Sequence, residues 1–348
     1  MCCVHFGVTL YYLVNYYKIM NNYLPKISHT IDQKNIHWCL KENYNSLSID
    51  WFIIVGKWMF NSYSVFKDHE KYLILIYLVK KTFDYYAIKF VRLSWDQFFA
   101  LKKIEVGKFS IIDVAKELKI SKETTRRKIE ELKRDNIIKK TKSGILFQTT
   151  FFNNEFNQNN KDFLKLVCSF VSKFSAVLVE NKVLKEKIQS QLIEKSVIEN
   201  FSSSWKIFFE MQIPLMIEWK FFFGDLETWH IWETSLINQN YEIQKYLKLK
   251  NFKIRNKKDF FEIHSKFMNK VGINAMSISD ITGIPRATVI RKLKKLINSK
   301  YLDVNNKKLY YINIKNYKQI SINKLNALNI QKLSIFLNKI LNLTIISK

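Results

Sequence analysis

The chain has 348 residues, of which 47% are hydrophobic, seven are Gly and three are Pro. This length and composition permit two or three domains with a sizeable core, and the scarcity of turn-forming residues disfavours an all-β sandwich. The formal net charge of +27 predicts a polyanionic partner such as DNA, RNA or an acidic membrane. The codon bias of an AT-rich genome also inflates the lysine content, so the charge alone does not identify the partner.

The amino-terminal segment, residues 1–17, is mostly apolar and contains no Lys, Arg, Asp or Glu. It lacks the basic start and the cleavage site of a signal peptide, and Asn15 interrupts it short of the roughly 20 apolar residues of a membrane span. We therefore expect a helical extension over residues 1–45 rather than a membrane anchor, with Met20 as an alternative start. A reducing cytoplasm is expected, because no pairing pattern joins the cysteines, which are Cys2, Cys3, Cys39 and Cys168.

Arginine is scarce, and its distribution singles out two short segments. Five of the seven arginines lie in or beside two stretches that align without gaps at a shift of 164 residues, Asp113–Leu132 and Ser277–Leu296. The paired positions include Val114 with Ile278, Ile120 with Ile284, Thr124 with Thr288, Arg127 with Arg291, and Leu132 with Leu296. An internal repeat of this kind predicts a duplicated structural unit.

The surroundings of the two segments also match in kind. An aromatic-rich helical stretch precedes each of them, over Trp51–Leu101 and Trp205–Phe267, and an apolar-periodic helix follows each. We expect a mainly α fold with small β-wings. Its expected units are a helical extension (1–45), a first helical plus motif unit (46–152, motif 110–149), a long linking helix that opens with a polar linker (153–200), a second helical plus motif unit (201–315, motif 277–312) and a carboxy-terminal helix (316–348).

The first segment predicts two short helices joined by a tight turn. Asp113 is a typical N-cap residue for the first helix, and Ser121 is one for the second. Apolar spacing places Val114 and Leu118 on one face of the first helix, and Ile120 in the turn. On the second helix, 4,3 spacing turns Thr125, Ile129 and Leu132 toward the core. The same spacing turns the amino-terminal polar residues outward, namely Lys122, Glu123, Thr124, Arg126 and Arg127.

The second segment repeats this pattern. Ser277 is expected to cap its first helix, Gly283 to form the turn, and Pro285 to occupy the first turn of the next helix. The inward residues are then Val289, Leu293 and Leu296, and the outward residues are Arg286, Ala287, Thr288, Ile290 and Arg291. Between residues 286 and 300 there are six basic residues and no acidic ones, which favours tight contact between this copy and a polyanion.

Each segment is followed by two short β runs that are joined by a turn. The first hairpin comprises Asn136–Lys140 and Ile145–Thr149, and the second comprises Tyr301–Val304 and Leu309–Ile312. Asn and Gly in the connections suit hairpin turns. The lysines near the hairpin tips are Lys140, Lys142, Lys307 and Lys308.

The strings SKETTRRKIEEL and PRATVIRKLKKL resemble the recognition helices of bacterial winged-helix regulators of the MarR, GntR and IclR kind. The resemblance covers about 40 residues in each copy and implies DNA binding, with the Thr and Arg positions meeting phosphates or bases. By that pattern Thr124, Arg127, Thr288 and Arg291 carry over. Thr125 departs from the usual Val, and the acidic residues of the first copy make it less basic than the second.

Apolar residues at 4,3 spacing continue for nearly four heptads through the expected linking helix: Phe163, Val167, Phe170, Phe174, Val177, Asn181, Leu184 and Ile188. Such a coiled-coil-like seam would support a homodimer, with Asn181 fixing its register. A long helix packed on its own domain explains the same spacing. The additional residues Leu164, Leu166 and Leu178 favour burial on two sides.

Two further groups of residues give weaker indications of function. The aromatic stretch Trp205–Asn238 would suit a pocket for a small-molecule effector, but packing between helices explains it more simply. Glu227, His230 and Glu233 share one helix, yet the paired motif of a two-metal helix bundle is missing. No nucleophile elbow, Gly-rich phosphate loop or carboxylate dyad is found. We therefore expect neither an enzyme, nor a metal, nor a cofactor.

The sequence thus predicts a sequence-specific transcription regulator of the cytoplasmic nucleoid that binds double-stranded DNA through two winged helix-turn-helix modules. Two alternatives stay open: a plasmid-type replication initiator, because tandem winged helices joined by a long helix resemble such proteins, and a winged-helix scaffold for protein partners in chromosome organisation. The residues expected to contact DNA are Lys122, Thr124, Arg126, Arg127, Lys142, Arg286, Thr288, Ile290, Arg291 and Lys307.

Overall fold

The computed structural model describes residues 30–101, 103–106, 109–140, 145–148, 154–249, 262–263, 265–267, 270–312 and 319–347. The fold is mainly α-helical, with small antiparallel sheets at the two expected hairpins. Residues 1–29, which include most of the expected amino-terminal extension and the alternative start, lie outside the described residues. None of the described helices combines the length and apolarity that crossing a membrane requires.

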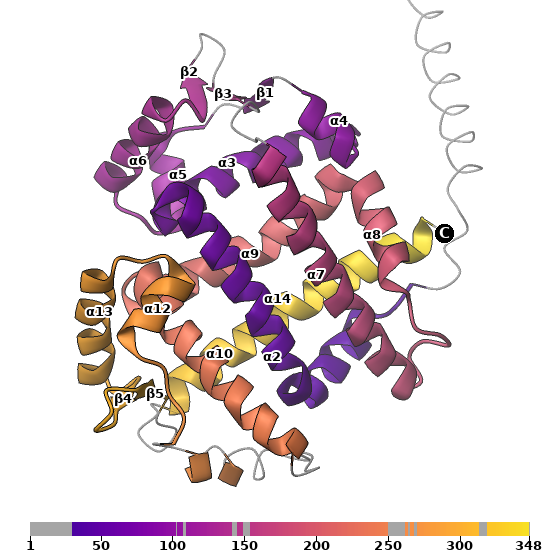
Figure 1. Cartoon of the computed structure of the whole chain (residues 1–348). Helices are drawn as coiled ribbons and strands as arrows, with labels where there is room; N and C mark the ends of the chain where they lie inside the picture. Colours follow the sequence, from indigo (N-terminus) through magenta and orange to yellow (C-terminus); the bar gives the residue numbers. More distant parts are fainter. Residues whose placement is uncertain are drawn as a thin grey trace, which may run out of the picture.

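Long helices form the body of the molecule (Figure 1). They are α2 (Gln33–Phe66), α3 (His69–Ile88), α7 (Asn154–Glu180), α8 (Ser190–Glu199), α9 (Phe201–Phe223), α10 (Leu226–Leu249) and α14 (Gln319–Ile346), with the short α4 (Trp95–Ala100) at one end. The expected carboxy-terminal helix corresponds to α14. The boundary expected between residues 45 and 46 falls inside α2, so the helix continues from the expected extension into the first unit.

The two sharp reversals in the body, from α2 to α3 and from α9 to α10, have local causes. Lys67 ends α2 in the left-handed region (φ 52°), and the Asp68 side chain accepts a hydrogen bond from the backbone N–H of Lys71 at the start of α3. Gly224 ends α9 in the same region (φ 84°), and Asp225 accepts from the N–H of Thr228. A left-handed residue followed by an aspartate N-cap therefore forms both turns.

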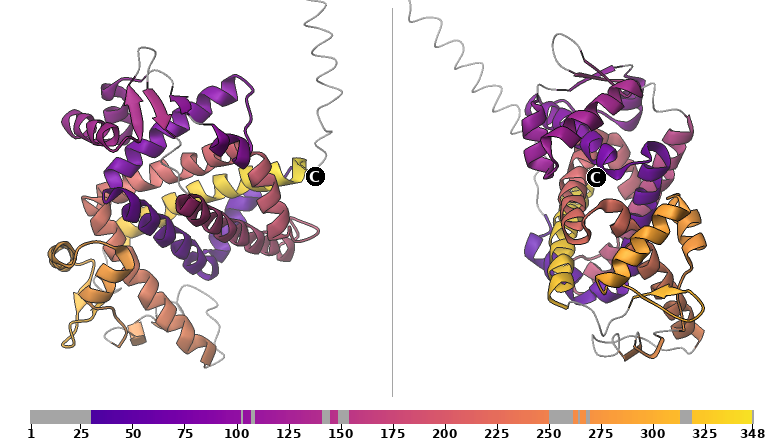
Figure 2. Two further views of the ribbon diagram at one scale, coloured as in Figure 1. Left: turned by 45° about the horizontal axis from the view of Figure 1, so that its top comes forward. Right: turned by 90° about the vertical axis from the view of Figure 1, so that its left-hand side faces the viewer.

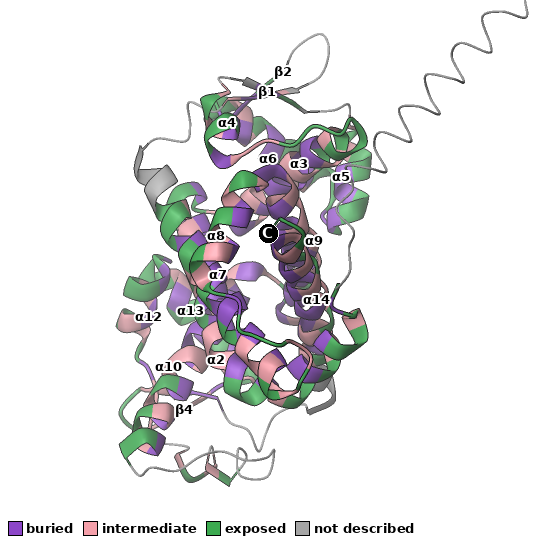
Figure 3. Cartoon of the chain, turned by 90° about the vertical axis from the view of Figure 1, so that its right-hand side faces the viewer, coloured by how far each residue is buried: buried purple, intermediate pink, exposed green. Residues whose placement is uncertain are grey.

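Segments that are distant in the sequence share one core. The last helix, α14, packs against α9 and α2, while α3 packs against α9 and α10 packs against α2 (Figures 1 and 2). A stack of indole rings runs through the centre, with Trp219 lying 5.5 Å from Trp58 and 4.4 Å from Trp229 between ring centroids. The buried side chains face this interior, and the outer turns of the helices are exposed (Figure 3).

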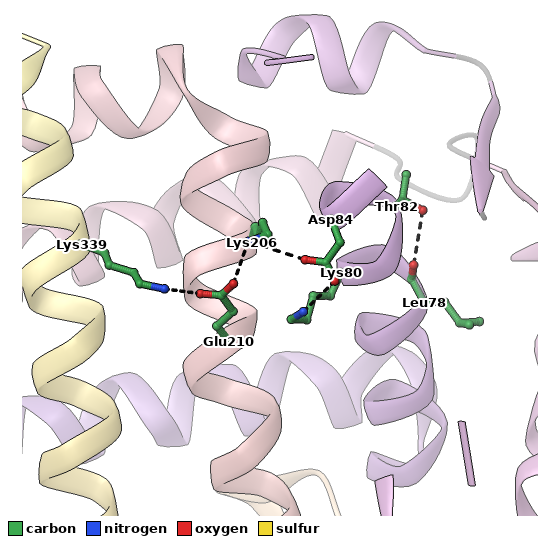
Figure 4. A network of polar contacts seen from close by, with 7 residues as sticks. All are labelled: Leu78, Lys80, Thr82, Asp84, Lys206, Glu210 and Lys339. Atoms are coloured by element: carbon green, nitrogen blue, oxygen red, sulfur yellow. Dashed lines mark hydrogen bonds and ion pairs between the residues drawn. The ribbon is translucent and has the colours of Figure 1, made fainter. Parts of the chain in front are cut away.

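A polar network reinforces the packing of α3, α9 and α14 (Figure 4). Glu210 on α9 accepts from Lys206 at 2.8 Å and from Lys339 on α14 at 2.6 Å. Lys206 also lies 3.6 Å from Asp84 on α3, which pairs with Lys80 at 2.8 Å. Burial by itself raises the pKa of Glu210, but the two lysines outweigh it and hold that pKa below its usual range.

The expected long linking helix over 153–200 is wrong, because the structure divides it into α7 and α8. Lys182 adopts a left-handed conformation (φ 60°), and the N–H of Val183 turns back to the carbonyl of Leu178, which ends α7. The coiled-coil-like seam therefore stops before Asn181, Leu184 and Ile188. Its helical part packs against α2 and α8 of the same chain, so the spacing reflects an internal core. The expected polar linker at 153–160 is likewise replaced by helix from Asn154 onward.

Candidate nucleic-acid interface

The first motif region comprises β1 (Lys103–Val106), α5 (Ile111–Leu118), α6 (Lys122–Arg134), β2 (Ile138–Lys140) and β3 (Ile145–Gln148). Ser110, rather than the expected Asp113, caps α5, because its Oγ accepts from the N–H of Asp113 at 3.0 Å. Lys119 ends the helix in the left-handed region (φ 50°). The buried side chain of Ile120 then fills the turn, as expected.

Helix α6 buries one face and exposes the other. Ser121 caps it, as expected, by accepting from the N–H of Thr124 at 3.1 Å. The predicted inward residues Thr125, Ile129 and Leu132 are all buried. Burial of the Thr125 hydroxyl is tolerated because it donates to the carbonyl of Ser121 at 3.0 Å.

The predicted contact residues on the outward face of α6 differ in exposure and in ion pairing. Lys122, Arg126 and Arg127 are exposed, and Thr124 is half-buried, with its Oγ accepting from Ser121 at 2.8 Å. Glu123 holds Arg126 through two hydrogen bonds of 2.7 and 3.1 Å. The hydrogen bond from Arg126 lowers the pKa of Glu123. Arg127 pairs with no acidic group in the described part of the chain.

The small sheet of this region has three antiparallel strands in the order β1-β3-β2. Phe147 on the central strand faces Ile104 on one side and Ile138 on the other, and all three side chains are buried. The expected hairpin is therefore present, and β1, which the sequence analysis did not anticipate, completes it. Lys142 lies outside the described residues, so its expected contact stays a prediction.

The second motif region comprises α12 (Ala275–Thr282), α13 (Arg286–Asn298), β4 (Asp303–Val304) and β5 (Tyr310–Tyr311). Asn274, rather than the expected Ser277, caps α12 by accepting from the N–H of Ser277 at 2.9 Å. Gly283 ends α12 with φ 69°, as its place in the turn requires. Pro285 occupies the N-cap position of α13, one residue before the first turn where it was expected.

Helix α13 divides its side chains as the sequence predicts. Val289, Leu293 and Leu296 are buried. Thr288 is half-buried, and the remaining outward residues are exposed, namely Arg286, Ala287, Ile290 and Arg291. Neither Arg286 nor Arg291 forms an ion pair with any residue that the structure describes.

A two-stranded antiparallel sheet follows α13, with Val304 opposite Tyr310. Ile273, just before α12, adds an isolated bridge to Tyr310. The turn is stabilised by Asn305, whose side-chain oxygen accepts from the N–H groups of Lys307 and Leu309, each at 3.0 Å. Lys307 is exposed on this turn, where the sequence places it.

Each motif region is fixed to the body by a lysine on its second helix whose side chain is largely shielded from solvent. Lys128 of α6 reaches Asp68, the N-cap of α3, at 2.5 Å, and Lys292 of α13 reaches Asp225, at the start of α10, at 2.6 Å. The two lysine side chains are 10% and 12% exposed. These contacts were missed in the sequence analysis, although both aspartates precede helices at positions typical of N-caps.

In these lysine–aspartate contacts, charge pairing has a larger effect on the pKa of Lys128 and Asp225 than burial does. Burial by itself lowers the pKa of Lys128, but Asp68 and Glu131 outweigh burial, and the net shift is upward. Burial by itself raises the pKa of Asp225, but hydrogen bonds from Lys292 and Thr228 outweigh it, and the net shift is downward. Asp68 thus stabilises the charged form of Lys128, and Lys292 stabilises the charged form of Asp225.

The helices α6 and α13 lie along one side of the molecule. In Figure 1, α6 and α13 are the outermost helices on the left, and the right-hand view of Figure 2 looks onto that side. Helix α3 carries the first motif region and α10 carries the second. These two helices carry the exposed residues Arg127, Arg286 and Arg291.

The acidic and histidine residues on α10 that the sequence analysis considered as metal ligands lie partly or fully inside the body. His230 and Glu233 are buried, and burial raises the pKa of Glu227. Within the described ranges there is no cluster of His, Cys, Asp and Glu side chains that could hold a metal ion.

Residues 104–151 match the family of DeoR-like helix-turn-helix domains. The match spans β1, α5, α6 and the hairpin, and it covers a minor part of the chain. Comparisons with curated proteins and with solved structures find no match. The chain therefore contains one DeoR-like helix-turn-helix domain, which indicates binding to DNA.

Proposed function

We propose that this protein is a sequence-specific transcription regulator, and that its second motif region is a further winged helix-turn-helix module acting on the same DNA molecule. The carrying observation is that Arg127, Arg286 and Arg291 are exposed without an ion-pair partner among the described residues, on two helices that lie along the same side of the molecule (Figure 1). Guanidinium groups in this state are suited to phosphates and to the edge of guanine.

The element boundaries support a second module. Helix α12 begins and ends 164 residues after α5, and α13 begins and ends 164 residues after α6. The left-handed residues Lys119 and Asn136 have counterparts at the same interval in Gly283 and Lys300. An unusual backbone conformation that recurs at one interval is consistent with two copies of one turn geometry.

The anchors support the same proposal. Lys128 and Lys292 are also 164 residues apart, and each binds an aspartate at the beginning of a body helix. Both motif regions would therefore be oriented in a similar way by their carrier helices. A duplex contacted by both would gain affinity through the effective concentration of the tethered second module.

A binding measurement on Arg291→Ala tests the proposal. The DNA ligand would be selected by the full-length protein from a random duplex library, and Lys187→Ala would be the matched control. Lys187 is exposed between α7 and α8, so both variants lose one positive charge. If Arg291 contacts a base, its variant loses about 1–3 kcal/mol of binding free energy, whereas the control keeps almost all of it. Wild-type affinity for Arg291→Ala contradicts the assignment.

Two further measurements separate regulation from the alternatives. Bound sites in promoters support a regulator, whereas repeated sites clustered at a replication origin support an initiator. Phosphate contacts predict that log K falls linearly with log salt, by about 0.9 per neutralised phosphate. A protein scaffold instead predicts weak DNA binding with little dependence on salt.

A further inference from the structure

A cavity of about 110 Å³ lies where the body meets the sheet of the DeoR-like domain. Its walls come from α2, α3, α4, α7, α9 and β3. Most of its lining side chains are aromatic, and none of the described residues that line it is charged. Part of the expected aromatic pocket, including Trp205, therefore contributes to a cavity, while Trp219 and Trp229 stack on each other away from it.

The size and lining of the cavity restrict what it can bind. Drug-sized ligands need pockets of about 300–1,000 Å³, whereas an apolar cavity of about 150 Å³ is known to bind benzene. A charged ligand would be buried here without a counter-charge, which costs several kcal/mol. The cavity therefore suits a neutral molecule with one six-membered ring.

One polar group in the wall lacks a partner. Trp58 lines the cavity and is 3% exposed, and its indole N–H has no hydrogen-bond acceptor. The hydroxyl groups of α2 and α3 that line the cavity already form hydrogen bonds. Ser62 donates to the carbonyl of Met59, and Tyr72 accepts from Gln212. An unpaired buried donor is unfavourable, and a ligand oxygen would satisfy it.

We propose that this cavity is a binding site for a small neutral aromatic molecule that carries one hydrogen-bond acceptor, such as a phenol. A ligand bound in the cavity would contact the DeoR-like domain directly, because Phe147 of its central strand β3 is part of the cavity wall. In the sheet, Phe147 lies opposite Ile104 of β1 and opposite Ile138 of β2.

Calorimetric titration of the full-length protein with phenol tests this proposal without DNA, so its outcome is independent of the proposed function. Saturable binding of one phenol per chain is expected, with benzoate binding at least about tenfold more weakly because its charge is buried unpaired. The absence of saturable phenol binding up to the solubility limit would overturn the proposal.

Two variants locate the site. Val79→Phe fills the cavity and is expected to abolish phenol binding, whereas the matched control Val65→Phe, at a 39%-exposed position on α2 outside the lining, keeps it.

Trp58→Phe keeps an aromatic ring but removes the N–H. It is expected to weaken phenol binding about 2- to 12-fold, the value of one hydrogen bond, and to leave benzene binding unchanged. If Val79→Phe does not fold, Trp58→Phe still decides, because equal phenol affinity in Trp58→Phe and wild type refutes the assigned contact.

Discussion

The two motif regions share a backbone plan but differ in the charge that they expose. In the first, Glu123 occupies Arg126, and Glu130 and Glu131 add further negative charge on α6. In the second, α13 carries no acidic residue, and among its basic residues Lys292 and Lys295 face Asp225 while Arg286 and Arg291 stay free of ion pairs within the described ranges. The comparison indicates that docking to the body is similar in both regions, whereas fewer of the exposed basic side chains are neutralised by acidic neighbours in the second.

Removing the outward arginines gives the largest expected contrast. Arg286→Ala/Arg291→Ala is expected to lose about 2–6 kcal/mol of DNA-binding free energy if both arginines contact bases, and to reduce the salt slope by about 1.8 if both neutralise phosphates. Arg126→Ala/Arg127→Ala is expected to lose less, because Glu123 already neutralises Arg126. Affinity measurements over a salt series check both variants. Equal losses would show that the ion pair does not weaken the first region.

Removing the anchoring lysines tests the part that the regions share. Lys128→Met and Lys292→Met keep an unbranched side chain but remove the nearest cation from a partly buried aspartate, so each should lower the free energy of unfolding by about 1–3 kcal/mol. Urea denaturation measures the change. The matched controls Lys122→Met and Lys294→Met replace exposed lysines on the same helices and should shift stability by less than about 0.5 kcal/mol. A loss in only one region would refute equivalent docking.

Acid should weaken the contact between the two carrier helices. His69 on α3 and His230 on α10 lie 5.2 Å apart between ring centroids. Burial lowers the pKa of His69 to about 3, and burial together with His69 lowers the pKa of His230. Because both values lie below that of the unfolded chain, about 6.5, these residues favour folding fully above pH 6.5 and lose that contribution as the pH falls toward 3.

The expected loss from His69 is at most about 1.4 kcal/mol over one pH unit, the value of one proton. His69→Asn should therefore flatten the plot of unfolding free energy against pH between 6.5 and 4, and His230→Asn should act in the same direction. Denaturation at several pH values measures the slope. A slope unchanged in both variants would mean that neither histidine is buried in its neutral form.

The smallest expected effect comes from releasing Arg126. Glu123→Gln removes the charge that holds the guanidinium and is expected to raise DNA affinity about 2- to 5-fold, since one exposed ion pair is weak. Glu218→Gln is a suitable control because Glu218 also pairs with a lysine, Lys119, but lies on α9. Unchanged affinity for Glu123→Gln would indicate that Arg126 does not contact DNA.

The sequence predicts the motif regions well because their structure depends on local patterns. The inward residues Thr125, Ile129 and Leu132 follow helical spacing, and Ser121 and Gly283 have side-chain or backbone properties that define a cap and a turn. The N-caps of α5 and α12 lie three residues before the predicted ones. Ser110 and Asn274 offer the same capping chemistry as Asp113 and Ser277, which the sequence analysis favours. Local preference alone does not rank such neighbours.

The linking helix fails as a prediction for a different reason. Apolar 4,3 spacing persists past Glu180, but the chain turns at Lys182 and places Ile188 in the same core from another direction, where its backbone groups bond with Ser172 and Ser175. Apolar periodicity indicates which residues are buried. It does not indicate whether they are buried by packing of one straight helix, by a partner chain or by two separate segments of the same chain.

The amino-acid sequence by itself determined the two helical motifs, their hairpins and the outward arginines, because each arises from interactions within a few residues of chain. The excess of positive charge follows from the composition alone. Tertiary structure alone decided that α14 closes over α2 and α9, that Asp68 and Asp225 anchor the motif regions, and that aromatic rings from six elements leave a cavity beside Phe147. Those features join residues that are remote along the chain. Their energies therefore depend on how the complete core packs, which no local pattern encodes.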